Sequence, residues 1–137
     1  MAVPRPLIAD LFAAFEKCLS TPGDDVTRFY ADAFVFAGPD GARALNRDAF
    51  ARALPGRDAF FRSLGLVGSR ITGVDEMILD ERYSLVRTTW AMTFRRDDDR
   101  MEEIPLAASY LVDTGSATPR FIAQLDHQDF VERVRHP

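Results

Sequence analysis

Residues that can exchange protons gather near the C-terminal end of the chain. The segment 121–130 reads FIAQLDHQDF and contains Asp126, His127 and Asp129. A carboxyl group in apolar surroundings has a raised pKa, because burial disfavours its charged form, and it can then act as a general acid or base near neutral pH. The segment therefore points to acid–base chemistry, with Asp126 and His127 as candidate catalytic residues.

Alternation along a strand separates these two candidates. Residues 120–127 are expected to form the last strand, in which neighbouring side chains point to opposite faces. One face carries Ile122, Gln124 and Asp126, and the other carries Phe121, Ala123, Leu125 and His127. Hydrophobic patterning alone favours the second face as the core, which would place His127 in the interior instead of Asp126.

Each candidate also has a purely structural interpretation. Asp126 can end a strand and bond to solvent or to an arginine such as Arg70 or Arg87. His127 can be a hydrogen-bonded structural or interface residue. Asp129 can start a turn or cap the tail that follows it.

The elements that must position these residues follow from hydrophobic periodicity. Apolar residues at helical spacing predict a helix over 5–19, a short helix begun by Thr21 and Pro22, and a helix that starts at Asn46, is interrupted at Pro55–Gly56 and resumes to residue 65. Alternating patterns predict strands over 33–38, 67–79, 83–96, 102–112 and 120–127. Residues 38–41 (GPDG) are expected to form a turn.

This order of elements predicts an α+β fold in one domain, residues 1–137. Each long strand has one apolar and one more polar face, which is typical of a mostly antiparallel sheet covered on one side. Gly68 or Gly73 can supply a bend. A strongly curved sheet closed by three N-terminal and central helices would leave a cone with an apolar interior and one open mouth.

Large side chains at strand spacing would form the wall of such a cone. They predict a pocket for a small apolar molecule. Its expected lining residues are Tyr30, Phe34, Phe36, Trp90, Met92, Tyr110 and Gln124.

Composition and residue inventory argue against several other classes of protein. The net charge is −4 and no cluster of basic residues is longer than Arg95–Arg96, so no nucleic-acid partner is expected. Two histidines and one cysteine, Cys18, give no metal-ligand spacing, and no phosphate-binding loop is present, so neither a metal nor a cofactor is expected. No apolar run approaches the roughly 20 residues that span a bilayer. We expect a cytoplasmic protein without a membrane partner.

The element order, with RFYADAFVFAGPDG at 28–41 and FIAQLDHQDF at 121–130, resembles the nuclear transport factor 2-like superfamily and its SnoaL-like (polyketide cyclase-like) branch. The resemblance implies that Asp126 lies inside the cone as the acid or base, with Gln124 beside it. It also implies a homodimer that pairs through the open sheet face, for which Thr89, Thr93, Ala107 and Ser109 are candidates.

Other members of the superfamily fit less well. Ketosteroid isomerases carry acids where this chain has Ala37 or Gly38 and Ala107 or Ala108, so steroid isomerisation is not expected. The Arg-x-Asp pair of the epoxide hydrolases becomes Arg87-x-Thr89, which lacks the acid.

Three functions remain open from the sequence. The chain can be an enzyme of cyclase, isomerase or dehydratase type that uses Asp126, a non-catalytic binder of an apolar metabolite, or a structural or partner-binding dimer. A cone filled by its own side chains would favour the last of these.

Overall fold

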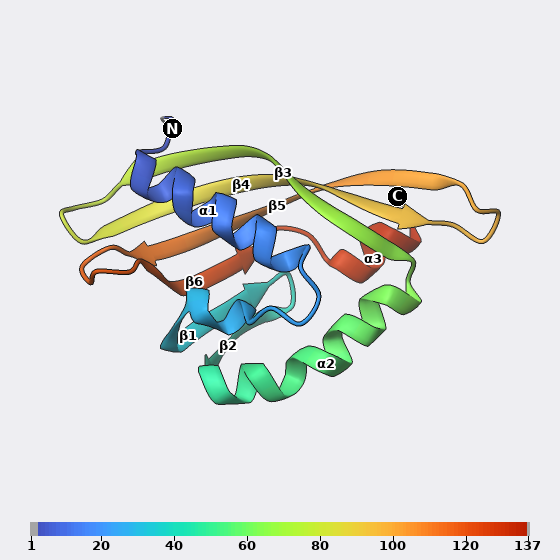
Figure 1. The fold of residues 1–137 in the computed structure, drawn as a ribbon, viewed down its shortest axis with the longest axis horizontal. Coiled ribbons are helices and arrows are strands. Elements are labelled where there is room, and N and C mark those ends of the chain that lie inside the picture. The colour runs from blue at the N-terminus through green and yellow to red at the C-terminus, as the bar shows by residue number, and fades with distance from the viewer. Residues whose placement is uncertain (1–2, 137) are drawn as a thin grey trace.

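The computed structural model describes residues 3–136 and contains the helices and strands that the periodicity predicts, with several additions (Figure 1). The helical elements are α1 (Pro6–Leu19), the 3₁₀-helix η1 (Val26–Phe29), α2 (Arg47–Ser63) and α3 (Phe130–Arg135). The strands are β1 (Tyr30–Gly38), β2 (Gly41–Asn46), β3 (Leu66–Ile78), β4 (Tyr83–Arg95), β5 (Met101–Asp113) and β6 (Arg120–Asp126).

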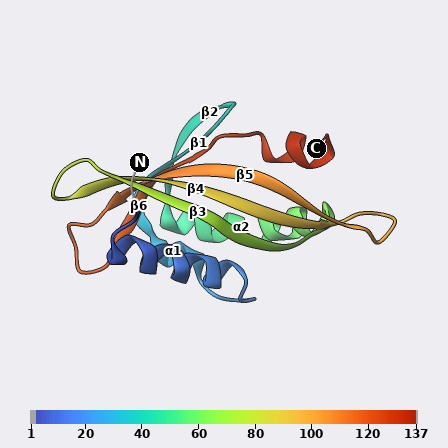
Figure 2. The same ribbon diagram turned by 90° about the horizontal axis from the view of Figure 1, so that it is seen from above.

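The strands form one six-stranded sheet in the order β2-β1-β6-β5-β4-β3. Only the β1–β6 pair is parallel, and every other neighbouring pair is antiparallel. Helices α1 and α2 lie on the same side of the sheet, and the C-terminal end of α2 lies beside α3 (Figures 1 and 2). The expected α+β fold with a mostly antiparallel sheet is thus confirmed.

The curvature of the sheet is accompanied by irregularities in strand register. In β3 the pairing with β4 shifts between Leu66 and Gly68 and again between Ile71 and Gly73. A Cβ atom on Gly73 would lie 2.7 Å from Thr89 Oγ1, so any larger residue at this bulge would force the Thr89 side chain to move. The backbone N–H of Ile71 donates to the Glu16 carboxylate of α1, which ties the helix to this edge strand.

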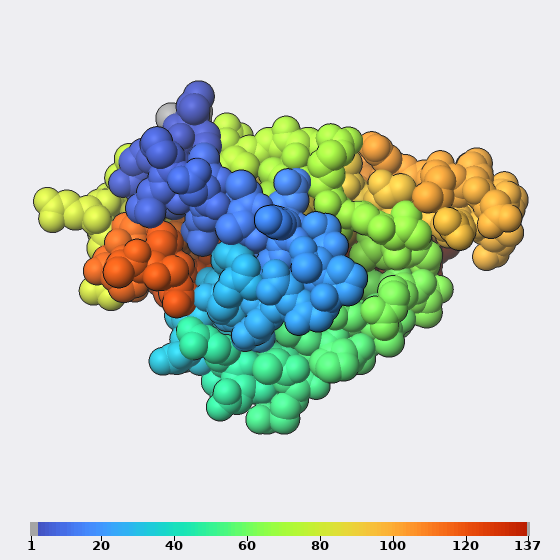
Figure 3. Space-filling view, in the orientation of Figure 1, coloured from blue at the N-terminus to red at the C-terminus, as the bar shows by residue number. Residues whose placement is uncertain are grey.

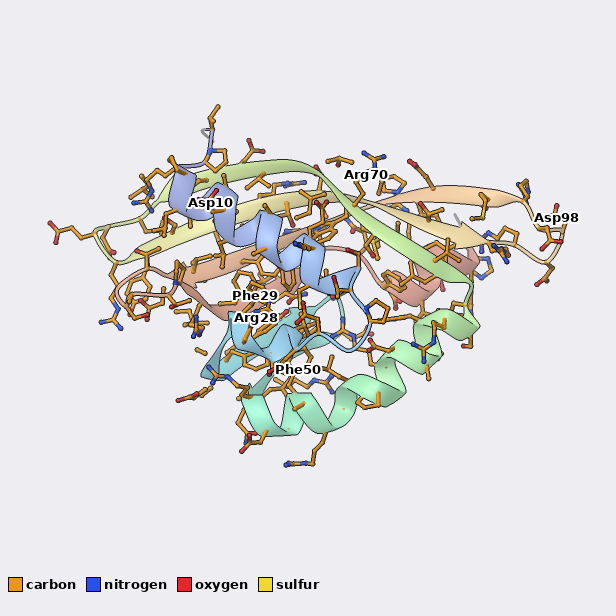
Figure 4. All side chains as sticks on the ribbon, in the orientation of Figure 1. Asp10, Arg28, Phe29, Phe50, Arg70 and Asp98 are labelled. Atoms are coloured by element: carbon orange, nitrogen blue, oxygen red, sulfur yellow. The ribbon has the colours of Figure 1, made fainter. Side chains whose placement is uncertain are left out.

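Aromatic rings fill the space between α1, η1, α2 and the sheet. Phe12 and Phe15 of α1 pack on Tyr110 and Phe121 with ring centroids 5.1–5.8 Å apart. Figure 4 shows Phe29 and Phe50 within the same layer, and both are buried. A second, smaller cluster of Phe94, Ile104 and Val134 lies under α3. Burial of these apolar side chains stabilises the packing of the helices on the sheet.

Two local predictions were wrong. Helix α2 continues through Pro55 without interruption. Because Ala51 and Pro55 are both exposed, water can satisfy the carbonyl group that loses its partner, while Phe50 and Leu54 keep the helix on the core. The short helix is capped by the Asp25 side chain, which accepts from the backbone N–H of Thr27, and the Thr21 hydroxyl instead donates back to the Lys17 carbonyl oxygen.

The strand β2 was not predicted either. Its six residues are exposed except for the half-buried Leu45, so the sequence lacks a period-two pattern there. Pairing with β1, from Gly38–Gly41 to Ala33–Asn46, defines this strand.

Candidate active site

A chain of hydrogen bonds links the interior of the cone to the end of β6. The Tyr30 hydroxyl donates to Gln124 Oε1, and Gln124 Nε2 donates to Asp126 Oδ1 at 3.1 Å. Tyr30 and Gln124 are buried, and Asp126 is half-buried. Because the hydroxyl proton fixes which end of the amide accepts, the Gln124 amide nitrogen must face the carboxyl group.

A β-bulge in β6 explains why these side chains point inward. Phe121 pairs with Val112 and Ala123 pairs with Leu111, so Ile122 is an extra residue without a partner. The bulge shifts the alternation by one position, and Phe121 is buried together with Gln124. Phe121, Gln124 and half-buried Asp126 thus come from both of the faces that strict alternation would separate.

Burial raises the pKa of the Asp126 carboxyl above its usual range. The hydrogen bond from Gln124 and the nearby side chains of Arg57 and His127 lower this pKa, but burial outweighs them. Burial also raises the pKa of the Tyr30 and Tyr110 hydroxyls, so both remain protonated. The site therefore presents one carboxyl group whose proton affinity is shifted towards that of a general acid or base.

His127 lies apart from the hydrogen-bonded residues Tyr30, Gln124 and Asp126. Its side chain is exposed, and its Nε2 atom lies 2.7 Å from Ser109 Oγ. Ser109 pairs with Leu125 on the sheet face opposite to α1 and α2. The structure thus does not bring Asp126 and His127 together. Asp129 caps α3 by accepting from the backbone N–H of Glu132 at 3.0 Å.

The expected lining residues fall into two groups. Tyr30, Phe34, Trp90 and Tyr110 are buried among other rings, and the Trp90 indole N–H donates to Thr88 Oγ1 at 2.7 Å. Phe36 and Met92 are half-buried. The deep part of the cone is therefore packed with the chain's own aromatic rings, and ligand access is expected only where half-buried side chains remain.

Four half-buried side chains from β1, α2 and α3 form a linked group that reaches Gln124 through Phe36. Phe36 is the β1 neighbour of Gln124, and Arg57 lies with its guanidinium carbon 5.3 Å from the centroids of both Phe36 and Phe61. The Phe61 and Phe130 centroids are 4.6 Å apart. We call Phe36, Arg57, Phe61 and Phe130 the mouth cluster.

The sequence interpretation missed Arg57. A signal was present, because Phe50, Leu54, Arg57 and Phe61 follow one another at helical spacing of four, three and four residues. An arginine within the apolar stripe of a helix faces the interior and not bulk water. The prediction of a helix break at Pro55–Gly56 hid this continuity.

Two surface hollows lie away from Asp126. One, of about 510 Å³, runs beside the β4–β5 hairpin, whose tip carries Asp98 (Figure 4), and its lining includes Leu64, Arg95 and Arg135. The other, of about 300 Å³, lies between α1, η1 and the β5–β6 loop, which adjoin on the face shown in Figure 3. Asp10, Arg28 and Phe29 contribute to it (Figure 4). Within residues 3–136 no group of three or more histidine, cysteine or acidic side chains is arranged to hold a metal ion.

Sequence comparisons find no relative for this chain. No protein-family model matches it. No curated protein matches it either. No helix among residues 3–136 is long and apolar enough to cross a membrane.

Solved structures, in contrast, match almost the whole chain. An NTF-2-like protein of unknown function from Shewanella oneidensis superimposes with a TM-score of 0.72 at 14% identity, over 92% of this chain and 100% of the other. The beta subunit of a benzoate 1,2-dioxygenase from Burkholderia mallei gives 0.69 at 17% identity, over 94% and 93%. A proposed scytalone dehydratase from Novosphingobium aromaticivorans gives 0.67 at 12% identity, over 90% and 83%. With its helices and mixed six-stranded sheet, this chain has the nuclear transport factor 2-like fold.

Proposed function

We propose that this chain binds a small apolar molecule at the mouth cluster and exchanges a proton with it through Asp126, in a reaction of cyclase, isomerase or dehydratase type. The observation that carries the proposal is the Tyr30–Gln124–Asp126 chain, which holds one carboxyl group at the edge of an aromatic interior. A protein that performed no such chemistry would gain nothing from this carboxyl group, because burial disfavours its charged form.

The hydrogen bonds give the carboxyl group a fixed orientation. Gln124 occupies Oδ1 of Asp126, which leaves Oδ2 to take or give a proton. Ala108, the β5 partner of Asp126, carries only a methyl group beside it. The fold shared with a proposed scytalone dehydratase is consistent with a reaction that needs only proton transfer and orientation of the substrate.

The proposal is tested with the purified chain and a panel of polyketide-like and terpenoid ketones and alcohols, with products followed by mass spectrometry. We expect turnover by the wild type and a loss of about 10²- to 10⁴-fold in Asp126→Asn. Asp40→Asn, which alters an exposed turn, is the matched control and should retain full activity. Turnover that survives Asp126→Asn would remove Asp126 from the mechanism. Binding without turnover would identify a non-catalytic binder.

A structural or partner-binding dimer is the second candidate, because an apolar row crosses the sheet on the face without α1 and α2. Met77, Leu85, Leu111, Ala123 and Val35 are successive partners across β3, β4, β5, β6 and β1. Met77 and Val35 are exposed, and the other three are half-buried. An exposed apolar face of this extent favours pairing with a second copy of the chain. The filled interior of the cone favours the same interpretation.

A further inference from the structure

Arg57 lies among aromatic rings and has no carboxylate partner among residues 3–136. Within residues 3–136, seven arginines form ion pairs with carboxylates, namely Arg5, Arg28, Arg47, Arg70, Arg82, Arg96 and Arg100. Arg57 is half-buried and is not among them. Its guanidinium instead lies 5.3 Å from the ring centroids of Phe36 and Phe61. Such contacts hold a cation through its attraction to the ring faces and do not use its N–H donors.

The position of Arg57 relates it to the Tyr30–Gln124–Asp126 chain. Phe36, on which the guanidinium lies, is the β1 neighbour of Gln124, and Gln124 donates to Asp126. The positive charge of Arg57 acts on Asp126, Tyr30 and Tyr110, since it opposes the rise that burial causes in the pKa of each group. The charge of Arg57 therefore reaches Asp126, although within residues 3–136 the two side chains do not form an ion pair.

We infer that Arg57 is the anion-recognising residue of this site and that the ligand is a planar, mostly apolar molecule bearing an anionic oxygen, either a carboxylate or an enolate. A guanidinium is planar and offers five N–H donors that match two oxygens at once, and the rings of the mouth cluster offer stacking surfaces to a flat molecule. This inference rests on the proposed function, because it names the substrate class of the same site.

The proton transfer proposed for Asp126 also gives the Arg57 guanidinium a role. The Asp126 carboxylate would take a proton from a carbon next to a carbonyl group. The electron pair of the broken C–H bond forms the new C=C bond, and the C=O π pair moves to oxygen. Arg57 would stabilise the resulting enolate oxygen, and return of the proton from Asp126 to another carbon of the enolate system completes an isomerisation.

The test compares two ligands that differ only in charge, 2-naphthoate and 2-naphthamide, by isothermal titration calorimetry. We expect the wild type to bind the naphthoate roughly tenfold more tightly than the amide. Arg57→Gln should abolish this preference, so that the naphthoate and the amide bind with equal affinity, and Arg57→Lys should retain part of it. Arg52→Gln, at an exposed position of the same helix, is the matched control and should keep the full preference.

A second measurement covers the case in which Arg57→Gln fails to fold. Raising the salt concentration should then weaken naphthoate binding to the wild type and leave amide binding unchanged. Equal affinities in the wild type, no binding of either molecule, or a preference that survives Arg57→Gln would overturn the inference. The proposed function is tested separately, by turnover in the wild type and in Asp126→Asn, and that test does not require an anionic ligand. Failure of one proposal can therefore be distinguished from failure of the other.

Discussion

At the scale of single residues, the candidate site combines a structural cost with a chemical use. Asp126 is held beside buried Gln124 and Tyr30, where its charged form is disfavoured. A carboxyl group in this environment lowers the stability of the folded state at neutral pH. Proteins keep such groups where activity requires them, and substitution there commonly stabilises the fold and removes the activity.

Asp126→Asn should therefore stabilise the protein at neutral and alkaline pH. A raised native pKa means that the folded state binds this proton more tightly than the unfolded chain does. Its favourable contribution is complete below the unfolded pKa of about 3.9 and is lost as the pH rises through the native value. Since asparagine stays neutral, we expect the variant to be more stable by about 1 kcal/mol at pH 8. The gain should vanish near pH 3 when urea unfolding is followed across this range, and a pH-independent difference would contradict the assignment.

At the scale of elements, an ion pair between half-buried Arg5 and buried Glu76 fastens the start of α1 to β3. Glu76 is 3% exposed and accepts hydrogen bonds from the backbone and side chain of Arg5 and from Ser84 Oγ at 2.6 Å. Burial alone would raise the pKa of the Glu76 carboxyl, but the hydrogen bonds from Arg5 and Ser84 outweigh it and hold the pKa below its usual value. The same helix is held further along by the Glu16 contact to Ile71.

Glu76→Gln should weaken this fastening, because it leaves the Arg5 guanidinium without its counterion. We expect a loss of about 2 kcal/mol at pH 7 in thermal or urea unfolding. Because the native pKa of Glu76 is lowered, its contribution to stability is complete above the unfolded pKa of about 4.3 and is lost as the pH falls through the native pKa. The free energies of unfolding of wild type and variant should therefore converge near pH 3. Glu103→Gln, which breaks the exposed pair with Arg70, is the control and should change stability by less than about 0.5 kcal/mol. If both variants lost a comparable amount of stability, the burial of Glu76 would not be the reason for the effect of Glu76→Gln.

The connection from α2 to β3 depends on one glycine. Gly65 has a φ of +98°, and a Cβ atom there would lie 2.3 Å from the Arg95 carbonyl oxygen. We expect Gly65→Ala to destabilise the protein by about 3 kcal/mol, since both the backbone conformation and the contact oppose it. Gly56→Ala has open space around it within α2 and should instead stabilise by about 0.5 kcal/mol. Unfolding curves of the two variants that move in the same direction would be inconsistent with this explanation.

At the scale of the whole molecule, one face of the sheet carries the helices and the other is open. The residues that the resemblance assigned to a dimer lie on the second face, but only Thr89 is exposed and Thr93 half-buried there, whereas Ala107 and Ser109 are buried. Leu125 pairs with Ser109 on the same face. Leu125 is 41% exposed. Together with the apolar row from Met77 to Val35, it extends the surface that we propose for a homodimer.

Leu125→Arg should convert this dimer to a monomer, because two copies of the new charge would meet across a symmetric interface. Sedimentation velocity at two protein concentrations measures the mass. Leu19→Arg, at a position 46% exposed at the end of α1, is the control and should leave the dimer intact. A wild type that sediments as a monomer at both concentrations would refute the proposed homodimer.

The sequence by itself determined the elements whose patterns are local. Helical spacing of Ile8, Leu11, Phe12 and Phe15 specified α1, and period-two alternation specified the four long C-terminal strands within one or two residues. These features were predictable because each depends on the spacing of residues that are close together in the chain.

Only the tertiary structure decided which side chains meet. The bulge at Ile122 arises from the pairing of β6 with β5, and it places Phe121 and Gln124 inside together, which strict alternation forbids. Arg57 joins the site because α2 continues past Pro55 and packs beside Phe36 of β1. The edge strand β2 exists through its pairing with β1. Each of these features depends on contacts between residues far apart in the chain, and local periodicity carries no information about them.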